Sequence, residues 1–190
     1  MSNPQQHIGL ALKQLRKNKG WSLDVTAKAT GVSKAMLGQI ERGESSPTIA
    51  VLWKIATGSQ TSLSYFLGPE VKNEVTPIFT SNHATREKPA QDDMLVATLF
   101  PFEDRFGFEV YELTLLPGYE RYSEPHEAGV TEHILVTQGE MELFIEGSWC
   151  KIAEGDAVRF QADQPHGYRN LGNKPAAFHD IIHYPNRKPS

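Results

Sequence analysis

The hydrophobic spacing of this chain changes near residue 69, and this change limits the possible folds most strongly. Up to about residue 67, apolar residues recur three and four positions apart, which is the spacing of one face of a helix. From Met94 onward, apolar and charged residues alternate, as they do over residues 140–146, and such alternation is typical of half-buried strands. A chain of 190 residues is long enough for two small domains. We therefore expect an α + β protein with an all-α domain followed by an all-β domain.

Serine and glycine residues divide the first region into short helices. Ser22 and Ser33 are suitable N-caps, because a serine oxygen can accept a backbone N–H of the first turn. Gly31 and Gly43 follow the next apolar runs as stop signals. The pattern predicts five helices, over 8–15, 22–30, 34–42, a stretch after Pro47, and 62–66.

The second region reads as a series of short strands. Residues 69–93 mix proline, asparagine, threonine and charged residues without periodicity, which predicts a linker between a domain of residues 1–68 and a domain of residues 94–190. Many short strands with close turns favour an antiparallel barrel of the jelly-roll type. The candidate strands are 94–100, 106–116, 132–137, 140–146, 157–160, 166–170 and 177–183.

Charge is distributed unequally between the two regions. Residues 1–68 carry eight Lys or Arg and three Asp or Glu, a net +5, whereas residues 69–190 carry eleven and twenty, a net −9. The first region can therefore meet a polyanion. The single cysteine, Cys150, excludes an internal disulfide framework. Since no apolar run approaches ~20 residues and no signal pattern opens the chain, we expect a cytoplasmic protein without a membrane anchor.

Two short helices joined by a tight glycine turn predict a helix-turn-helix motif. In such a motif the second helix fits the major groove, which is about 12 Å wide, while the first helix braces on the DNA backbone. The run GWSLDVTAKATGVSKAMLGQIERGESSPT resembles the lambdoid-repressor and Cro-like class, known as the XRE family. The resemblance extends over residues 8–67 and implies that duplex operator DNA is the partner.

The resemblance also implies roles for individual residues. It places Lys34, Ala35 and Gln39 against bases and Ser22 against a phosphate, and it joins Arg16 to Glu41 between the first and third helices. Without the motif, Lys34 and Gln39 would read as solvated surface residues. The predicted DNA-binding set is Ser22, Ser33, Lys34, Ala35, Gln39 and Arg42.

Two stretches of the second region carry spaced glycine, histidine and acidic residues. In the first, five residues separate Gly118 from Glu124-Pro125-His126, and six residues separate Glu132 from Gly139. The second contains Gly155, His166 and Asn170. These two stretches resemble the signature motifs of the cupin family. This sequence departs from the family pattern because Glu124 replaces the first histidine and because the gap from His126 to Glu132 is long.

The cupin resemblance implies a divalent metal, with zinc or iron favoured. The predicted ligands are Glu124, His126, Glu132 and His166, a mixture of histidine and carboxylate that either metal accepts. Glu132 shares strand parity with Ile134, so it is expected to point inward, where an unpaired carboxylate is costly. His133 has the opposite parity and is expected outside the pocket. The alternative is a metal-free pocket in which Glu132 and His166 only form hydrogen bonds.

A small molecule is the expected occupant of the barrel, although the sequence does not identify it. The resemblance suggests amino acids, polyamines or related sulfur and nitrogen metabolites, and we favour an amino-acid-like effector. The residues predicted to contact it are Tyr111, Arg121, Arg159, Tyr168 and His179.

Two classes of function remain open at this point. The first is a transcriptional regulator, not an enzyme, in which the cupin domain senses a metabolite and alters DNA binding. The second is a metal-dependent cupin enzyme, of the dioxygenase or isomerase type, with an appended DNA-binding domain. An antitoxin-like protein with a structural cupin is a weaker third reading. A homodimer is expected, since two-fold symmetry would set two recognition helices about 34 Å apart.

Overall fold

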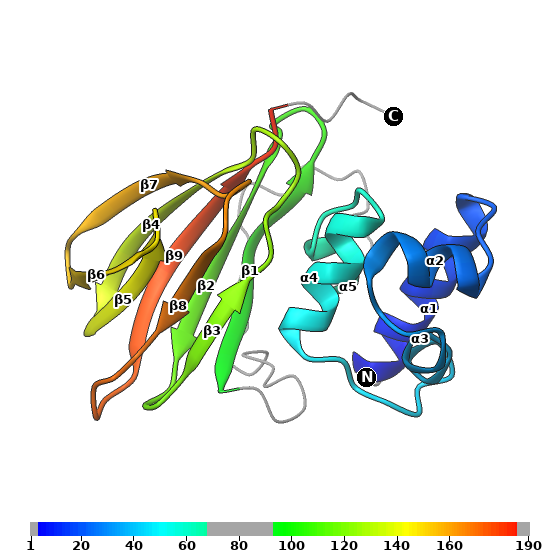
Figure 1. The fold of residues 1–190 in the computed structure, drawn as a ribbon, viewed down its shortest axis with the longest axis horizontal. Coiled ribbons are helices and arrows are strands. Elements are labelled where there is room, and N and C mark those ends of the chain that lie inside the picture. Colours follow the sequence, from blue (N-terminus) through cyan, green and yellow to red (C-terminus); the bar gives the residue numbers. More distant parts are fainter. Residues whose placement is uncertain (1–3, 68–92, 186–190) are drawn as a thin grey trace. The chain divides into compact units, whose positions relative to one another are not determined.

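The structure is a computed structural model that describes residues 4–67 and 93–185. The chain divides into two compact units, one containing the helices and the other containing the strands (Figure 1). The expected α + β architecture is confirmed, and the strands form two antiparallel sheets, as a barrel of the predicted jelly-roll type does. The predicted linker lies outside the described residues except for Asp93. No helix in the described ranges is long and apolar enough to cross a membrane.

Five helices build the described part of the helical unit, as the sequence predicts. A common core of aliphatic and aromatic side chains holds them together, including Leu12 of the first helix and Leu37 of the third, both with 1% exposure or less. The helices are α1 (Pro4–Asn18), α2 (Leu23–Thr30), α3 (Lys34–Glu41), α4 (Ile49–Gly58) and α5 (Ser64–Leu67).

The predicted caps explain where α2 and α3 begin and where α2 ends. The hydroxyl oxygen of Ser22 accepts a hydrogen bond from the backbone N–H of Val25, and that of Ser33 accepts one from Met36. Gly31 ends α2 with a φ of 66°, a left-handed conformation that glycine adopts without a steric penalty. The two helices are thereby joined by a turn of three residues, 31–33.

Nine strands form the described part of the second unit, and they make two sheets that face each other (Figure 1). One sheet has the order β1-β2-β9-β4-β7 and the other the order β3-β8-β5-β6. The strands are β1 (Met94–Glu103), β2 (Phe108–Leu115), β3 (Glu120–Ser123), β4 (Thr131–Gln138), β5 (Glu140–Ile145), β6 (Ser148–Ala153), β7 (Ala157–Gln161), β8 (His166–Arg169) and β9 (Ala176–His183).

The sequence did not predict β3 and β6. Both are edge strands of the four-stranded sheet, and neither contains a buried residue. Because an edge strand pairs on one side only, these two strands need little apolar surface, and their sequences lack the alternation that marks the other strands.

Strand β9 organises the interior because it pairs with both β2 and β4. Asp180 of β9 is opposite Tyr111 of β2 and Ile134 of β4, and all three side chains are buried between the sheets. Since alternate residues of a strand face opposite sides, Phe178 and Ile182 share this inner face, whereas His179 lies on the outer face. The inner face of the five-stranded sheet therefore supplies one wall of the barrel.

Asn170, which matches the end of the second cupin motif, is 1% exposed. Its Nδ2 donates to the carbonyls of Leu115 and Lys174 at 3.0 and 2.9 Å, and its Oδ1 accepts from the N–H of Gly172 at 2.9 Å. The side chain thus fastens the end of β8 to the end of β2.

Candidate metal centre and candidate nucleic-acid interface

Two histidines and one glutamate meet inside the barrel. His126 lies in the segment between β3 and β4, Glu132 is on β4, and His166 begins β8. One ligand atom from each of the three lies within 4.8 Å of the others. Nε2 of His126 is 2.8 Å from Oε1 of Glu132, and Nε2 of His166 is 3.6 Å from the same oxygen. Three of the four predicted metal ligands therefore converge on one point.

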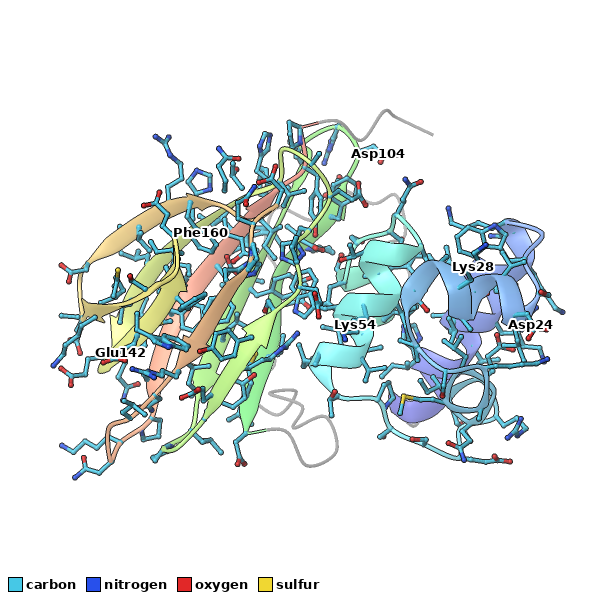
Figure 2. All side chains as sticks on the ribbon, in the orientation of Figure 1. Asp24, Lys28, Lys54, Asp104, Glu142 and Phe160 are labelled. Atoms are coloured by element: carbon cyan, nitrogen blue, oxygen red, sulfur yellow. The ribbon has the colours of Figure 1, made fainter. Side chains whose placement is uncertain are left out.

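Strand register and packing fix the direction of these side chains. Glu132 is opposite Phe160 of β7 and Ile182 of β9, and its side chain is 1% exposed. Phe160, which is labelled in Figure 2, holds its ring 5.4 Å from that of His166. The expectation from strand parity that Glu132 points inward is confirmed. On the other side of the cluster, Nδ1 of His166 lies 2.9 Å from the backbone carbonyl of Gln164.

The hydrogen bond at Gln164 determines which nitrogen of His166 is available. A backbone carbonyl can only accept, so Nδ1 carries the proton and Nε2 carries a lone pair. This Nε2 is buried and has no hydrogen-bond partner within the described ranges. Metal-binding histidines typically hold their second ring N–H in this way, against a backbone carbonyl or a carboxylate.

The electrostatics of the cluster favour an ionised glutamate beside a neutral His166. Burial alone would raise the pKa of Glu132, but His166, His126 and the Tyr168 hydroxyl outweigh it and lower this pKa. Burial lowers the pKa of His166 despite the attraction of Glu132. Burial, followed by the charge of Glu132, raises the pKa of Tyr168, so its hydroxyl stays protonated and donates to Oε2 of Glu132. An ionised glutamate and a neutral histidine are the protonation states that metal coordination requires.

The donor set fits a divalent metal ion. Two imidazole nitrogens and a carboxylate oxygen suit zinc or iron, and the unpartnered Nε2 of His166 would act as one ligand. Glu124 is the exception to the predicted set, since it is exposed in the segment that follows β3 and is not part of the cluster. His126 and Glu132 therefore lie in contact despite the long gap between them in the sequence. Glu124, which replaces the first histidine of the family pattern, lies outside the cluster.

Two further acidic residues lie inside the barrel, and the sequence analysis missed both. Glu109 of β2 and Asp180 of β9 are 0% and 2% exposed. The hydroxyl of Tyr184 donates to Oε1 of Glu109 at 2.6 Å, whereas Oδ1 of Asp180 has no hydrogen-bond partner among the described residues. Burial, followed by the charges of Glu132 and Glu109, raises the pKa of Asp180 well above its ordinary value. The parity of Asp180 with Phe178 and Ile182 was the available signal.

The five predicted effector contacts separate into two groups. Tyr111, Arg121 and Tyr168 lie on inner faces, and Arg121 is opposite Tyr168 in the four-stranded sheet. Nε of Arg121 is buried and has no hydrogen-bond partner in the ranges that the structure covers. In contrast to the expectation, Arg159 and His179 lie on the outer face of the five-stranded sheet, because their neighbours in the strands, Phe160 and Asp180, point inward.

The six residues predicted to contact DNA all lie on the surface of the helical unit. They are Ser22, Ser33, Lys34, Ala35, Gln39 and Arg42, and all six are exposed. Met36 is also partly exposed on α3, whereas Leu37 and Ile40 of the same helix are buried. One face of α3 therefore anchors the helix, and the other presents these side chains to solvent.

Comparisons with known proteins agree with both halves of this description. A helix-turn-helix family model matches residues 12–66, and a cupin domain model matches residues 111–182. The HTH-type transcriptional regulator SutR of Escherichia coli K12 is 45% identical over 185 residues, which are 97% of this chain and 99% of SutR. The HTH-type transcriptional regulator SinR of Bacillus subtilis 168 is 37% identical over 68 residues, 35% of this chain and 61% of SinR.

A solved structure extends the comparison to the whole fold. The crystal structure of an HTH_3 family transcriptional regulator from Vibrio cholerae superposes with a TM-score of 0.83. It is 46% identical, and the match covers 96% of this chain and 97% of that one. The combination of the two units in one chain is therefore shared with this regulator.

Proposed function

Because this chain belongs to the XRE-type helix-turn-helix transcriptional regulators that carry a cupin domain, we propose that its cupin unit is a sensor that controls operator binding. The convergence of His126, Glu132 and His166 in the interior of that unit is the observation that carries the proposal. We take the protein to be a cytoplasmic, non-enzymatic regulator that acts where chromosomal DNA is accessible.

The exposed face of α3 is the proposed reader of DNA bases. Gln39 can form a bidentate contact with adenine, and the methyl group of Ala35 suits thymine. Ser22 and Ser33 lie at the N-termini of α2 and α3, where backbone N–H groups and the helix dipole favour phosphate. Selection of DNA from a random library with the full-length protein tests this role. Enrichment of a defined motif is expected, and its absence would contradict it.

A divalent metal ion is the proposed cofactor of the sensor unit. The metal would be held by His126, Glu132 and His166, and it would supply a Lewis acid to which a ligand group or water can bind. The residues themselves fix the imidazole orientation, keep the carboxylate ionised and exclude solvent. Elemental analysis of protein purified without chelators should find about one zinc or iron per chain, and His126→Ala or His166→Ala should abolish it, because the two remaining ligands seldom hold an ion tightly.

Glu124→Ala is the matched control for the metal experiment, since it removes a predicted ligand that lies outside the cluster. Its metal content should equal that of the parent protein. If the parent binds neither zinc nor iron when either metal is supplied, the metal-free pocket would replace this part of the proposal.

An amino-acid-like effector would match two unpartnered polar groups inside the barrel. Arg121 presents an unpartnered, buried Nε that could pair with a carboxylate, and Asp180 presents an unpartnered oxygen that could accept from an ammonium group. Both groups act on Tyr168, since the charge of Asp180 raises its pKa and that of Arg121 lowers it. A small molecule with both a carboxylate and an ammonium group would satisfy both positions.

Reciprocal coupling is the test of sensing. An effector can change DNA affinity only through its different affinities for two states of the protein, and DNA must then change effector affinity by the same factor. Native mass spectrometry would first identify the bound molecule. The affinity of the protein for this molecule, measured by calorimetric titration with and without the selected operator, should differ by roughly 5- to 150-fold. Equal affinities in the two titrations would contradict the sensor role.

A cupin enzyme is the second candidate, because three protein ligands leave room on the metal for substrate, as in catalytic zinc sites. Turnover of the identified molecule with iron restored would favour this candidate.

A homodimer is part of the first proposal, since paired recognition helices match two-fold related half-sites. Sedimentation at micromolar concentration should show a dimer, and a monomer with unchanged operator affinity would contradict it.

A further inference from the structure

Each end of α3 carries a cation that is paired with an exposed carboxylate. Lys34 is the first residue of the helix, and its Nζ lies 2.8 Å from Oδ2 of Asp24 in the first turn of α2. The two side chains are 59% and 69% exposed. Figure 2 labels Asp24 on α2. The pair therefore connects the two helices of the motif, on the surface that is proposed to bind DNA.

Arg42, the C-cap of α3, has a similar partner. Its Nε and Nη2 donate to the two carboxylate oxygens of Glu44 at 2.8 and 2.7 Å, a bidentate arrangement. The hydrogen bond from Arg42 lowers the pKa of Glu44, so this carboxylate is ionised at neutral pH. Both cations at the ends of α3 are thus neutralised by acidic neighbours.

Glu41, the one acidic residue within α3, does not compete for these cations. Glu41 is held by Arg16 through two hydrogen bonds, and its side chain is 8% exposed. Between Lys34 and Arg42, the exposed residues of α3 are uncharged, namely Ala35, Met36 and Gln39. The exposed face of α3 with its two carboxylate partners therefore carries no net charge, although the helical domain as a whole is basic.

Such neutrality has a direct consequence for binding to a polyanion. Sequence-independent affinity for DNA comes from cations that neutralise phosphates and release counterions, and this makes it salt-dependent. A cation that is already paired with a carboxylate releases few counterions. Exposed ion pairs contribute little to folding stability, so the main effect of these two pairs falls on DNA binding.

We propose that Asp24 and Glu44 are positioning residues that withhold Lys34 and Arg42 from the phosphate backbone and thereby keep the affinity for non-operator DNA low. The proposal rests on the proposed DNA-binding function. Operator recognition then depends mainly on the base contacts of α3. All four side chains are exposed, so the pairs can form and break without any change of fold.

Isosteric neutralisation of one carboxylate tests the proposal. In full-length protein, Asp24→Asn and Glu44→Gln each remove one negative charge and leave the side-chain volume almost unchanged. Binding to a random-sequence duplex is measured by fluorescence anisotropy over a series of salt concentrations. Each variant should bind this duplex more tightly than the parent, and the slope of log affinity against log salt should steepen by about 0.9 for each phosphate that the released cation neutralises.

Asp104→Asn provides the matched control. Asp104 is exposed on the turn between β1 and β2, in the strand unit, and is labelled in Figure 2. The substitution changes the net charge of the chain by the same amount but lies outside the helical unit, so the salt slope should not change. Thermal unfolding at matched salt should show that all three variants are folded. Equal effects of Asp24→Asn and Asp104→Asn would overturn the proposal, because net charge alone would then explain them.

A double variant separates pairing from direct repulsion. If Asp24 acts through Lys34, then Asp24→Asn should have no effect on random-sequence affinity once Lys34→Ala is present. A full effect in that background would show that Asp24 repels phosphate directly, which would also overturn the pairing role. A parent protein that binds no DNA in the library selection would contradict the proposed function itself, whereas a parent that binds an operator but has insensitive variants contradicts only this inference.

Discussion

The guanidinium of Arg16 on α1 forms a bidentate ion pair with the carboxylate of Glu41 on α3. Nε donates to Oε1 at 2.6 Å and Nη2 donates to Oε2 at 2.9 Å, while Nη1 donates to the carbonyl of Trp21 at 3.0 Å. The two side chains are only 17% and 8% exposed. The family resemblance implied this pair, and the geometry shows that it connects two helices and the turn that follows the first.

Removal of Arg16 should destabilise the helical unit. Arg16→Ala leaves Glu41 shielded from solvent without its main donor, a situation that typically costs about 1–3 kcal/mol. Circular dichroism at the helix band during urea unfolding measures the loss. Arg42→Ala is the control, since it removes an exposed arginine from a pair at the surface, and its unfolding free energy should differ little from that of the parent. Similar losses in both variants would contradict the structural role of Arg16.

The Tyr168 hydroxyl should strengthen metal binding. Tyr168→Phe keeps the ring, which stacks on Phe178 with centroids 5.8 Å apart, but removes the hydrogen bond to Glu132. Loss of such a supporting contact typically weakens metal affinity about 10- to 100-fold. Competition of zinc with a chelator measures the change. Tyr122→Phe, at a 57% exposed position, is the control, and equal zinc affinity in both variants would refute the prediction.

Asp180 should make stability depend on pH. Its pKa is raised in the folded protein, so the folded state binds a proton that the unfolded state releases once the pH exceeds the ordinary aspartate value. The contribution of Asp180 is therefore greatest below that value and is lost as the pH rises toward the raised pKa. Asp180→Asn removes this titration, so the variant should gain unfolding free energy relative to the parent as the pH rises from the ordinary aspartate value across the neutral range. A constant difference across that range would contradict the assignment.

Two glycines of the helical unit should respond oppositely to alanine. A Cβ at Gly58 would lie 2.4 Å from the carbonyl oxygen of Ala29, so Gly58→Ala forces α4 away from α2 and should cost about 1–3 kcal/mol. A Cβ at Gly38 would lie 3.1 Å from the flexible Arg42 guanidinium and 3.9 Å from Cδ1 of Leu23, which is an ordinary van der Waals contact. Gly38→Ala should therefore gain up to about 1 kcal/mol from helix propensity. Thermal unfolding of both variants, followed at the helix band, distinguishes the two results.

Local signals in the sequence predicted most of the fold. The capping serines and the glycine stops are read from single positions, and the structure uses Ser22, Ser33 and Gly31 as expected. The edge strands β3 and β6 were missed because edge strands need not alternate. Their existence depends on neighbours that are distant in sequence, such as the pairing of Arg121 with Tyr168.

The same division applies to the candidate site. Strand parity correctly placed Glu132 inside the barrel, because it depends on one strand only. On the last strand, parity with Phe178 and Ile182 places Asp180 inside and His179 outside, so the prediction that His179 lines the pocket was wrong. The position of Glu124 could not be derived from parity, because it lies beyond the end of β3 and its direction depends on the path of the chain there.

Asn170 has both amide hydrogens and its carbonyl oxygen committed to the backbone, at Leu115, Lys174 and Gly172. It therefore has a different task from His166, although one motif contains both. A descendant chain could lose its histidines and keep this asparagine, since closing the barrel requires no ion. In a related sequence, a match at Asn170 is thus informative about loop closure, whereas retention of the metal has to be judged from the histidines and the glutamate alone.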